Sequence, residues 1–376
     1  MNTEELSGKR IAVLLSGGVD SSVAVYELVH VGLCPDCFYI KIGPEDRDEW
    51  DCSMEEDLEM ATAVARRYGC RLEVVDCHRD YWDRVTAYTI DKVRAGLTPN
   101  PDVMCNRLIK FGAFDEKRGH DYDLIATGHY AQTEADLHTL TEGGGERGPL
   151  KWLCTAPDPV KDQTDFLAQI EGWQLQKALF PIGRYMKDEV RRIAEREHLV
   201  SAHRKDSQGI CFLGKIDYNE FLRRYLGEEQ GDIVELETGH LIGHHRGHWF
   251  HTIGQRKGLG LPGGPWFVVK KDAAHNVLYV SHGYDPAAAY CQHFPVHAFH
   301  SLNGVLPPAS VTIKIRHTPQ WHAATLEPLD DTGTYMVHAD TPIHGVAPGQ
   351  FCVVYDAQHH RCYGSAEISC GSPCPR

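Results

Sequence analysis

The sequence predicts an α/β protein in three parts, because its pattern changes twice along the 376 residues. The first part alternates apolar strand-like runs with helical stretches, which is typical of a Rossmann-like parallel sheet with helices on both faces. A helical pattern follows. After about Gly227, short β-like runs between Gly, Pro and Asp predict a small antiparallel barrel or sandwich. We expect the parts to span 1–160, 161–226 and 227–376, with about 198–215 returning to the first.

The first part contains four expected strands and four expected helices. The strands are Arg10–Leu15, Cys37–Ile42, Arg71–Val75 and Leu124–Ala126. The helices are Ser22–Val31, Met54–Tyr68, Tyr81–Val93 and Asn106–Lys117. Parallel sheets of this kind bind ligands beyond the carboxyl ends of their strands, so we expect a site after Leu15.

The second part reads as four short helices and the third as a series of strands. The helices are Asp165–Ile170, Trp173–Leu179, Lys187–Glu197 and Tyr218–Leu226. The clearest strands are Trp266–Val269, Val277–Val280, Val311–Ile315, Thr334–His338 and Phe351–Tyr355.

Composition is that of an ordinary globular protein, with 42% hydrophobic and 24% charged residues. No apolar run is long enough for a membrane span, and the first ten residues lack a signal-peptide core, so we expect a cytoplasmic protein with no membrane partner. Its thirteen cysteines should then be mostly thiols. The net charge of −14 argues against a generally basic RNA-binding coat, although 181–225 holds a modest excess of Lys and Arg.

The most informative motif is the turn after the first strand, Leu14-Leu15-Ser16-Gly17-Gly18-Val19-Asp20-Ser21-Ser22. Two adjacent glycines let the backbone bend tightly and leave room for a ligand. The following amides and the helix N-terminus point at an anion, and the serines add hydroxyl donors. The turn matches neither the Walker motif nor the G-x-G-x-x-G turn. It resembles the pyrophosphate loop (PP-loop) of enzymes that cleave ATP between the α and β phosphates.

Cys105 follows a segment held extended by Pro99 and Pro101. We expect a helix to begin near Cys105 or Asn106, which would lower the pKa of the thiol. Asp102, three residues earlier, could move a proton or position a substrate. A small buried helix residue explains Cys105 equally well from the local sequence.

Cys211 lies in a turn between glycines, which suits an accessible thiol, although a buried cysteine beside Phe212 is as compatible with the local sequence. The pair Cys34 and Cys37, and the wider pair Cys370 and Cys374, do not by themselves make a zinc site, and we predict no metal site. Four histidines on a Gly-rich stretch are expected to form a solvated or RNA-facing loop: His244, His245, His248 and His251.

Taken together, these motifs resemble the tRNA-specific 2-thiouridylase (MnmA) family of the PP-loop ATP pyrophosphatase superfamily over nearly the whole chain. The matching segments are Ser16–Ser22, Thr98–Phe111, Ala126–Tyr130, Lys161–Gln163, Asp206–Phe212, Thr252–Gly260 and Pro348–Gln350. Their occurrence together and in this order is specific to the family.

The resemblance implies that sulfur replaces the C2 oxygen of uridine 34 in the anticodon stem-loop of a tRNA, at the expense of ATP with Mg²⁺. Adenylation bonds that oxygen to the α-phosphate, so that it can leave as part of AMP, a good leaving group. Sulfur would arrive as a persulfide on Cys211, supplied by a cysteine desulfurase or a sulfur-relay protein. It would attack C2 directly, or be freed when Cys105 forms a disulfide with Cys211. Asp102 would carry the proton.

The resemblance also implies binding roles for individual residues. Those implied to contact ATP are Leu14, Leu15, Ser16, Gly17, Gly18, Val19, Asp20, Ser21, Ile40 and Gly128. Those implied to border the target base are Asn100, Pro101 and Asp102. Those implied to face tRNA are His129, Lys161, Asp162, Gln163, Arg316, His317 and Gln350. Ile40 stands where the family usually has Met, and His317 where it usually has Tyr, so a tyrosine stacking contact is missing there.

Three other functions remain open at this point. An adenylating C–N ligase could use the same loop but would not need Cys105 and Cys211. The same thiolation could instead proceed through an iron–sulfur cluster held by Asp102, Cys105 and Cys211, with one open iron. A non-catalytic RNA-binding protein is disfavoured by the net acidity and by the intact nucleotide and thiol motifs.

Overall fold

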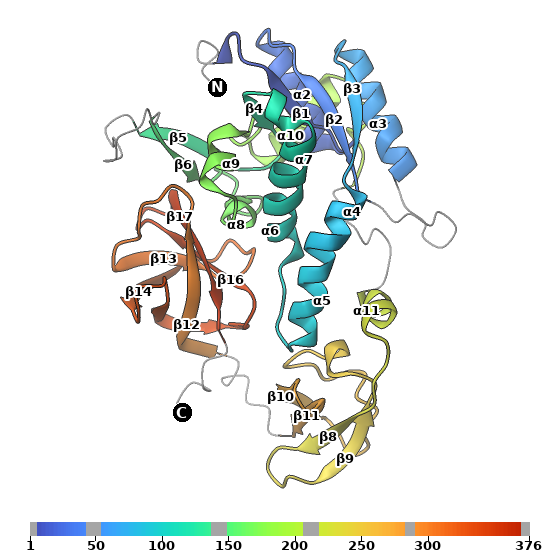
Figure 1. Cartoon of the computed structure of the whole chain (residues 1–376), viewed down its shortest axis with the longest axis vertical. Helices are drawn as coiled ribbons and strands as arrows, with labels where there is room; N and C mark the ends of the chain where they lie inside the picture. The colour runs from blue at the N-terminus through green and yellow to red at the C-terminus, as the bar shows by residue number, and fades with distance from the viewer. Residues whose placement is uncertain (1–5, 43–53, 137–148, 206–217, 283–289, 370–376) are drawn as a thin grey trace.

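The computed structural model describes residues 6–42, 54–136, 149–205, 218–282 and 290–369. Figure 1 shows three bodies: an upper α/β body with the N-terminus, a barrel at lower left, and a small β domain at the bottom. Among the described residues, no helix has both the length and the apolar composition needed to cross a membrane. The predicted order of an α/β part, a helical middle and an antiparallel β barrel is confirmed.

The α/β body is built on a five-stranded parallel sheet of order β3-β2-β1-β4-β7. The strands are β1 (Ile11–Leu14), β2 (Asp36–Lys41), β3 (Leu72–Asp76), β4 (Leu124–Ala126) and β7 (Ala178–Leu179). In β1, Val13 pairs with Cys37 of β2 and with Ala126 of β4. Four of these strands are predicted from sequence, whereas β7 was expected to be the end of a helix.

Alternating side chains of β1 enter two different cores, as the period of two in a strand requires. Ile11, Val13 and Leu15 pack with α2 (Val19–His30) and α3 (Met54–Arg67) on one face. Ala12 and Leu14 pack on the other face with the helices between Tyr81 and Lys117. The sheet is therefore buried on both faces, which explains why its strands read as continuous apolar runs.

The helices of the second face are each interrupted by a π-helical stretch. The first runs through α4 (His78–Asp80), η1 (Tyr81–Thr86) and α5 (Ala87–Arg94). The second runs through α6 (Pro101–Cys105), η2 (Asn106–Ala113) and α7 (Phe114–Lys117), followed by a short 3₁₀ turn, η3 (Gly119–Asp121). Figure 1 shows the second as one long rod that descends from the sheet toward the barrel.

The helical middle joins the α/β body to the two β domains. Its helices are α8 (Thr164–Leu167), α9 (Gly172–Lys177), α10 (Lys187–Arg196) and α11 (Tyr218–Leu226). Val190, Ile193 and Ala194 of α10 pack on Val19 and Val23 of α2. The first helical residue of α10 therefore lies close to the turn that begins α2.

The small β domain holds a four-stranded sheet of order β10-β11-β8-β9. Its elements are β8 (Gly231–Glu235), β9 (Leu241–His245), η4 (His248–Phe250), β10 (Phe267–Asp272) and β11 (Val277–Ser281). Ile233, Val268, Leu278 and Val280 form its separate core.

The barrel belongs to an eight-stranded sheet of order β12-β15-β14-β13-β16-β17-β6-β5, and it closes because β12 also pairs with β17. Its six closing strands are β12 (Tyr290–Ser301), β13 (Ser310–Lys314), β14 (His322–Pro328), β15 (Tyr335–His344), β16 (Phe351–Tyr355) and β17 (Arg361–Ile368).

The remaining two strands of that sheet come from the first part of the chain. They are β5 (Gln132–Asp136) and β6 (Leu150–Cys154), and β6 joins β17 through the pair Cys154–Arg361. No local sequence pattern predicts this hairpin, because the strand that covers its edge, β17, lies at the far end of the chain.

A buried ion pair also links the helical middle to the barrel. Lys314 Nζ of β13 lies 3.3 Å from Asp162 Oδ2, and both side chains are only 2% exposed. Asp162 Oδ1 accepts hydrogen bonds from Thr164 Oγ1 at 2.6 Å and from the Ala156 amide at 3.0 Å. The carboxylate therefore fixes the loop 155–163 against the barrel.

Replacing Lys314 with Met should destabilise the protein by about 3–5 kcal/mol, because it leaves the Asp162 carboxylate buried without its cation. Urea unfolding followed by circular dichroism measures the change. The double variant K314M/D162N should lose much less than the sum of the two single variants. A K314M protein as stable as the parent would mean that the ion pair does not hold the loop.

Candidate functional site

The turn between β1 and α2 has the backbone geometry of an anion site. Gly17 has φ +80°, and a Cβ atom on it would lie 2.3 Å from the Asp57 carbonyl oxygen. Gly18 is the N-cap of α2 and supplies no side-chain cap. The first-turn amides of α2 therefore remain available to a ligand such as a phosphate. We call the residues Leu15–Gly18 the phosphate loop.

The serines of the motif mainly shape this loop. Ser21 Oγ donates to the Gly18 carbonyl at 3.1 Å and accepts from the Ser16 amide at 3.2 Å. Ser22 is fully buried, donates to the Gly18 carbonyl at 2.8 Å and accepts from Ser201 Oγ at 2.9 Å. Ser16 and Ser21 thus lie at the loop itself, whereas Ser22 supports it from within the protein.

Asp20, in the first turn of α2, is paired with a lysine that the sequence pattern does not reveal. Lys187 Nζ lies 2.7 and 2.9 Å from the two carboxylate oxygens, and Tyr130 Oη donates to the same carboxylate at 2.8 Å. Lys187 is only 8% exposed. Its position as the first residue of α10, packed on α2, brings this charge to the phosphate loop.

Gly128 and His129 follow β4 at the same edge of the sheet. A Cβ atom on Gly128 would lie 2.8 Å from the Ser21 amide nitrogen, so only glycine allows this close approach. His129 is buried, and its Nδ1 lies 2.7 Å from Thr127 Oγ1. Burial, reinforced by the charge of Lys110, holds the pKa of His129 well below its ordinary value, so the imidazole is neutral.

The other sheet-edge residues predicted to contact ATP lie around this loop. Leu14 and Leu15 are buried, and the Leu15 amide donates to the Phe38 carbonyl at 2.8 Å. Val19 is buried in the core between α2 and α10. Ile40 is partly buried near the end of β2, two residues beyond the partner of Leu14. Ile40 therefore lies at the same carboxyl edge as the phosphate loop.

The helix that carries Cys105 begins four residues earlier than expected. It starts at Pro101, and the N-cap Asn100 accepts a hydrogen bond from the Val103 amide at 3.3 Å. Asp102, rather than Cys105, occupies its first turn. The expectation of a thiol at a helix N-terminus is therefore wrong: Pro101 has no amide hydrogen to lose and starts the helix itself. Cys105 is buried, with 2% of its surface exposed.

The residues that follow Cys105 in the rod face the segment after β6. Asn106 is buried, and its Nδ2 donates to the Phe166 carbonyl at 2.9 Å. Its Oδ1 is buried without a hydrogen-bond partner among the described residues. Arg107 pairs with Glu171 and donates to Gln169 at 3.2 Å. Arg107 is therefore partly buried and held by these two side chains.

A loop of the barrel forms hydrogen bonds with the two residues that precede Asn100 in the sequence. Gln350 Nε2 donates to the carbonyls of Thr98 at 3.1 Å and Pro99 at 2.9 Å, and the Thr98 amide donates to Pro348 at 2.8 Å. Gly349 has φ +90°, and a Cβ on it would collide with Thr98. In this arrangement Gln350 positions the Asn100–Asp102 segment.

The segment Lys161–Gln163 lies beside His129. Gln163 exchanges two hydrogen bonds with the Tyr130 backbone, from its own amide at 2.8 Å and through its Oε1 at 3.0 Å. Lys161 is half-buried. Asp162 is buried in its pair with Lys314, which suits support of the loop better than contact with a ligand.

Arg316 and His317 follow β13 at the barrel rim. Arg316 is exposed and donates to the Gly345 carbonyl at 2.7 Å. His317 Nδ1 lies 3.2 Å from each carboxylate oxygen of Asp165, which raises the pKa of the imidazole. Its ring lies 4.5 Å from that of Phe166. An aromatic contact is thus present at the position where the family usually has Tyr.

Cys211 lies outside the described residues, as does the segment Asp206–Phe212. The described chain before it ends next to the phosphate loop. Arg204 donates to the Gly17 carbonyl at 3.3 Å and pairs with Asp57 of α3. No motif in the sequence points to Arg204.

The Cys34–Cys37 pair is divided between the surface and the interior, and the histidine cluster differs from the sequence expectation. Cys34 is exposed, whereas Cys37 is buried and its thiol interacts with Cys70, which lies in the turn between α3 and β3. His245, His248 and His251 are buried in the small β domain, so they do not form a solvated loop. Burial lowers the pKa of both His248 and His251 to about 4.

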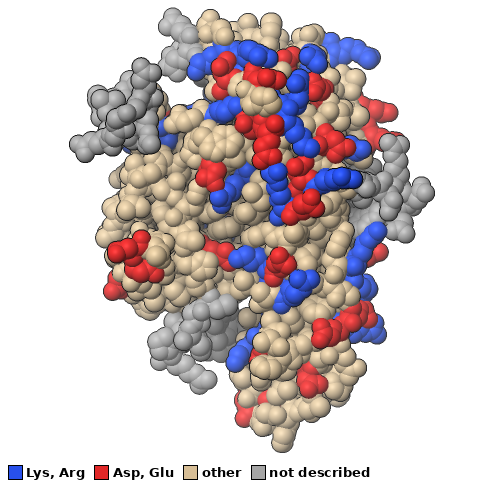
Figure 2. All heavy atoms as spheres, viewed as in Figure 1, with Lys and Arg blue, Asp and Glu red and all other residues tan. Residues whose placement is uncertain are grey.

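The described surface carries no broad area of one charge on the face drawn in Figure 2. Lys and Arg alternate with Asp and Glu over the α/β body and its helices, while the barrel surface is largely uncharged there. Affinity for a polyanion on this face would depend on individual cations rather than on a continuous basic patch.

Comparison with known proteins identifies related sequences over almost the whole chain. Family models match a tRNA methyl transferase HUP domain over residues 9–215, a tRNA methyl transferase PRC-barrel domain over 219–282 and an aminomethyltransferase beta-barrel domain over 291–368. Among solved structures, a 4-thiouridine synthetase–RNA complex with bound ATP is 15% identical, with a TM-score of 0.31 over 58% of this chain and 50% of that one.

Curated relatives are much more similar. The tRNA-specific 2-thiouridylase MnmA 2 of Bacteroides fragilis is 58% identical over 95% of this chain and 99% of its own length. The MnmA enzymes of Parabacteroides distasonis and Porphyromonas gingivalis are each 55% identical, over 95% and 96% of this chain and 98% and 99% of their own lengths. With this identity over its whole described architecture, the chain belongs to the tRNA-specific 2-thiouridylase (MnmA) family.

Proposed function

We propose that this protein uses ATP to replace the C2 oxygen of uridine 34 in a tRNA anticodon with sulfur. The observation that supports the proposal is that the phosphate loop and the rod that carries Cys105 are neighbours in the fold. Gly128 approaches the Ser21 amide, His129 follows Gly128 and its pKa is lowered in part by the charge of Lys110, and Lys110 lies on the rod about one turn from Asn106 and Cys105. A nucleotide activated at the loop and a base beside Cys105 would then share one site.

The first half of the reaction is adenylation. The C2 oxygen of the uridine attacks the α-phosphate of ATP, which enters as its Mg²⁺ complex, and pyrophosphate leaves. Amides of Gly18, Val19 and the following turn of α2 would donate hydrogen bonds to the phosphates. Lys187 neutralises Asp20, so that its carboxylate does not repel the nucleotide.

The second half is sulfur transfer. The terminal sulfur of a Cys211 persulfide attacks C2, the C2–O bond breaks, and AMP leaves with the bonding electrons. In the variant of this route that uses both thiols, Cys105 attacks Cys211, forms a disulfide and frees the sulfur, and an external dithiol then reduces the pair. Asp102, half-buried in the first turn of α6, is the proton carrier.

Chain length supports a role for Cys211 at this site. It lies seven residues beyond Arg204, which contacts the phosphate loop, and seven residues extend at most about 25 Å. A cysteine desulfurase or relay protein would load the persulfide. Reduced thiols and tRNA as the substrate are consistent with the cytoplasm.

The anticodon loop would lie between the rod and the barrel rim. His129, Lys161, Gln163, Arg316 and His317 are the candidate contacts from the described residues. Phe166 links the rod to the barrel rim, because its carbonyl accepts a hydrogen bond from Asn106 and its ring contacts that of His317. Asp162 and Gln350 would support the site without touching the tRNA. Asp162 fixes the loop that carries Lys161 and Gln163, and Gln350 fixes the segment that carries the base-bordering residues Asn100 and Pro101.

Replacing Cys211 with Ser should abolish 2-thiouridine formation but leave tRNA-dependent release of pyrophosphate within a few fold, because adenylation needs no thiol. Cys105→Ser should also lose thiolation. Nucleoside mass analysis of the tRNA and a pyrophosphate assay measure the two halves. If both variants still form 2-thiouridine, the proposed thiol chemistry is wrong. If the anaerobically purified parent protein has visible absorbance that C105S lacks, an iron–sulfur cluster carries out the sulfur transfer and the persulfide route is wrong.

Replacing Lys187 with Met should raise the KM for ATP about tenfold, the effect of losing roughly 1.4 kcal/mol of electrostatic compensation beside the phosphates. Arg192→Gln, an exposed change on the same helix, is the matched control for the KM for ATP. Steady-state kinetics with saturating tRNA make the comparison. Equal ATP constants for K187M and the parent would contradict the role given to the Asp20–Lys187 pair.

Affinity for tRNA should fall as the pH rises from about 6 to 8, because His317 loses its proton and charge over this range. Its pKa is raised by Asp165, so the charged form persists further toward neutral pH than for a free imidazole. Filter binding at several salt concentrations tests this: at pH 6 the salt slope of His317→Gln should be shallower by about one. A pH dependence that is the same in H317Q and the parent removes His317 from the interface.

A further inference from the structure

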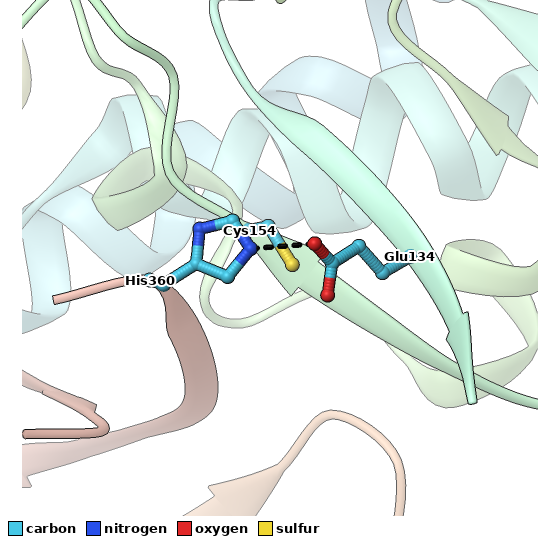
Figure 3. A group of neighbouring side chains, drawn as sticks. All are labelled: Glu134, Cys154 and His360. Atoms are coloured by element: carbon cyan, nitrogen blue, oxygen red, sulfur yellow. Dashed lines mark hydrogen bonds and ion pairs between the residues drawn. The ribbon is translucent and has the colours of Figure 1, made fainter. Parts of the chain in front are cut away.

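Glu134, Cys154 and His360 form a compact cluster where the β5–β6 hairpin meets the barrel. One potential ligand atom from each residue lies within 4.8 Å of the other two. Figure 3 shows the three side chains pointing toward one another, with the sulfur beside the imidazole–carboxylate contact. Neither the family motifs nor the proposed thiolation chemistry uses any of them.

Strand register explains why these residues meet. Gln132 of β5 is the direct partner of Cys154, so Glu134, two residues further, lies on the same face of the hairpin. Arg361 of β17 pairs with Cys154 on its other side, which brings His360 next to it. Asp356 accepts the His360 amide at 2.7 Å, and the Thr155 amide donates to the His360 carbonyl at 2.9 Å. The backbone beneath the cluster is thus fixed.

We propose that this cluster binds a zinc ion that joins the hairpin to the barrel. A thiolate sulfur, an imidazole nitrogen and a carboxylate oxygen are the donors that zinc takes in proteins, and water can complete a tetrahedral site. Binding replaces the thiol proton of Cys154, which passes to the solvent, and leaves His360 neutral. No oxidation or reduction is involved, because zinc has a single stable ionic state.

The distances allow such a site after small side-chain movements. Tetrahedral zinc with ordinary bond lengths separates its ligand atoms by about 3.3–3.8 Å. His360 Nε2 and Glu134 Oε1 are now 2.6 Å apart, so their hydrogen bond must open by about 1 Å as the ion enters. Cys154 is fully buried, whereas the side chains of Glu134 and His360 are 43% and 41% exposed, so the ion can enter from solvent on their side.

Arg361 is the cation that competes for the site, and its geometry leaves room for zinc. Its Nε lies 3.4 Å from Glu134 Oε2, the oxygen that does not face His360. A carboxylate that binds a metal through one oxygen and a neighbouring donor through the other is a common arrangement around protein metal sites. Asp136 Oδ2, at 3.8 Å, gives Arg361 a second partner once zinc withdraws charge from Glu134.

Zinc at this place would stiffen the loop that follows β6. Thr164 Oγ1 donates to the Cys154 carbonyl at 3.3 Å, and the Ala156 amide binds Asp162. The ion would therefore hold the loop 155–163 at its first residue, while Asp162 holds it near its end. This consequence is structural and does not depend on the proposed function.

The test is equilibrium dialysis of the reduced, metal-free full chain against buffered Zn²⁺, with zinc per chain measured by mass spectrometry. The parent should bind one equivalent more than Cys154→Ser, His360→Gln or Glu134→Gln, each of which should lower affinity at this site by at least about 100-fold. His359→Gln is the matched control: its ring stacks on Trp321 at 4.6 Å, outside the cluster, and it should keep the full stoichiometry.

Cobalt provides a second readout that separates this site from the other cysteines. Co²⁺ bound to a thiolate gives a charge-transfer band, which should weaken in Cys154→Ser and keep its intensity in His359→Gln. If burial of residue 154 prevents the serine variant from folding, the partly exposed His360→Gln variant carries the same comparison. Equal zinc stoichiometry and equal cobalt spectra in the parent, H360Q and E134Q would overturn the proposal.

Discussion

The proposed site depends on one backbone constraint: the chain must reverse from β1 into α2 within four residues while leaving the first amides of the helix uncapped. Gly17 takes a conformation that other residues avoid, and Asp57 closes the space that a side chain would need. Gly128 then approaches the same amides from β4. Because α3 and the residues after β4 hold the loop from two sides, its amides are oriented before a phosphate arrives, which lowers the entropic cost of binding.

Much of the α/β body could be predicted from sequence because its signals are local. Buried parallel strands such as Ile11–Leu14 read as apolar runs, and the strand Leu124–Ala126 was predicted with its observed bounds. Two kinds of element could not be predicted from the local sequence. Strand β7 is two residues long and exists only because β4 offers it an edge. The strands β5 and β6 are partly polar, and their pairing with β17 is a tertiary effect that no window of sequence contains.

The candidate site divides in the same way. The glycines and serines of the phosphate loop could be predicted because their order between a strand and a helix is what makes a phosphate-binding turn. Lys187, Lys314 and Arg204 could not, because each acts on a residue more than a hundred positions away. The helix start expected at Cys105 is wrong because prolines favour an extended approach in the local pattern, whereas Pro101 occupies the first helical position. Buried His248 and His251 show that histidine clusters carry little information without tertiary contacts.

The sharing of strands between the two ends of the chain has a consequence for biosynthesis. The β5–β6 hairpin emerges from the ribosome long before Arg361, the residue that pairs with Cys154, has been translated. Until then the outer edge of β6 presents unpaired amides and carbonyls, which nascent chains of other proteins could also join. Premature termination anywhere before β17 would leave this edge permanently open, so a truncated product should be prone to aggregate even if its nucleotide-binding half has folded.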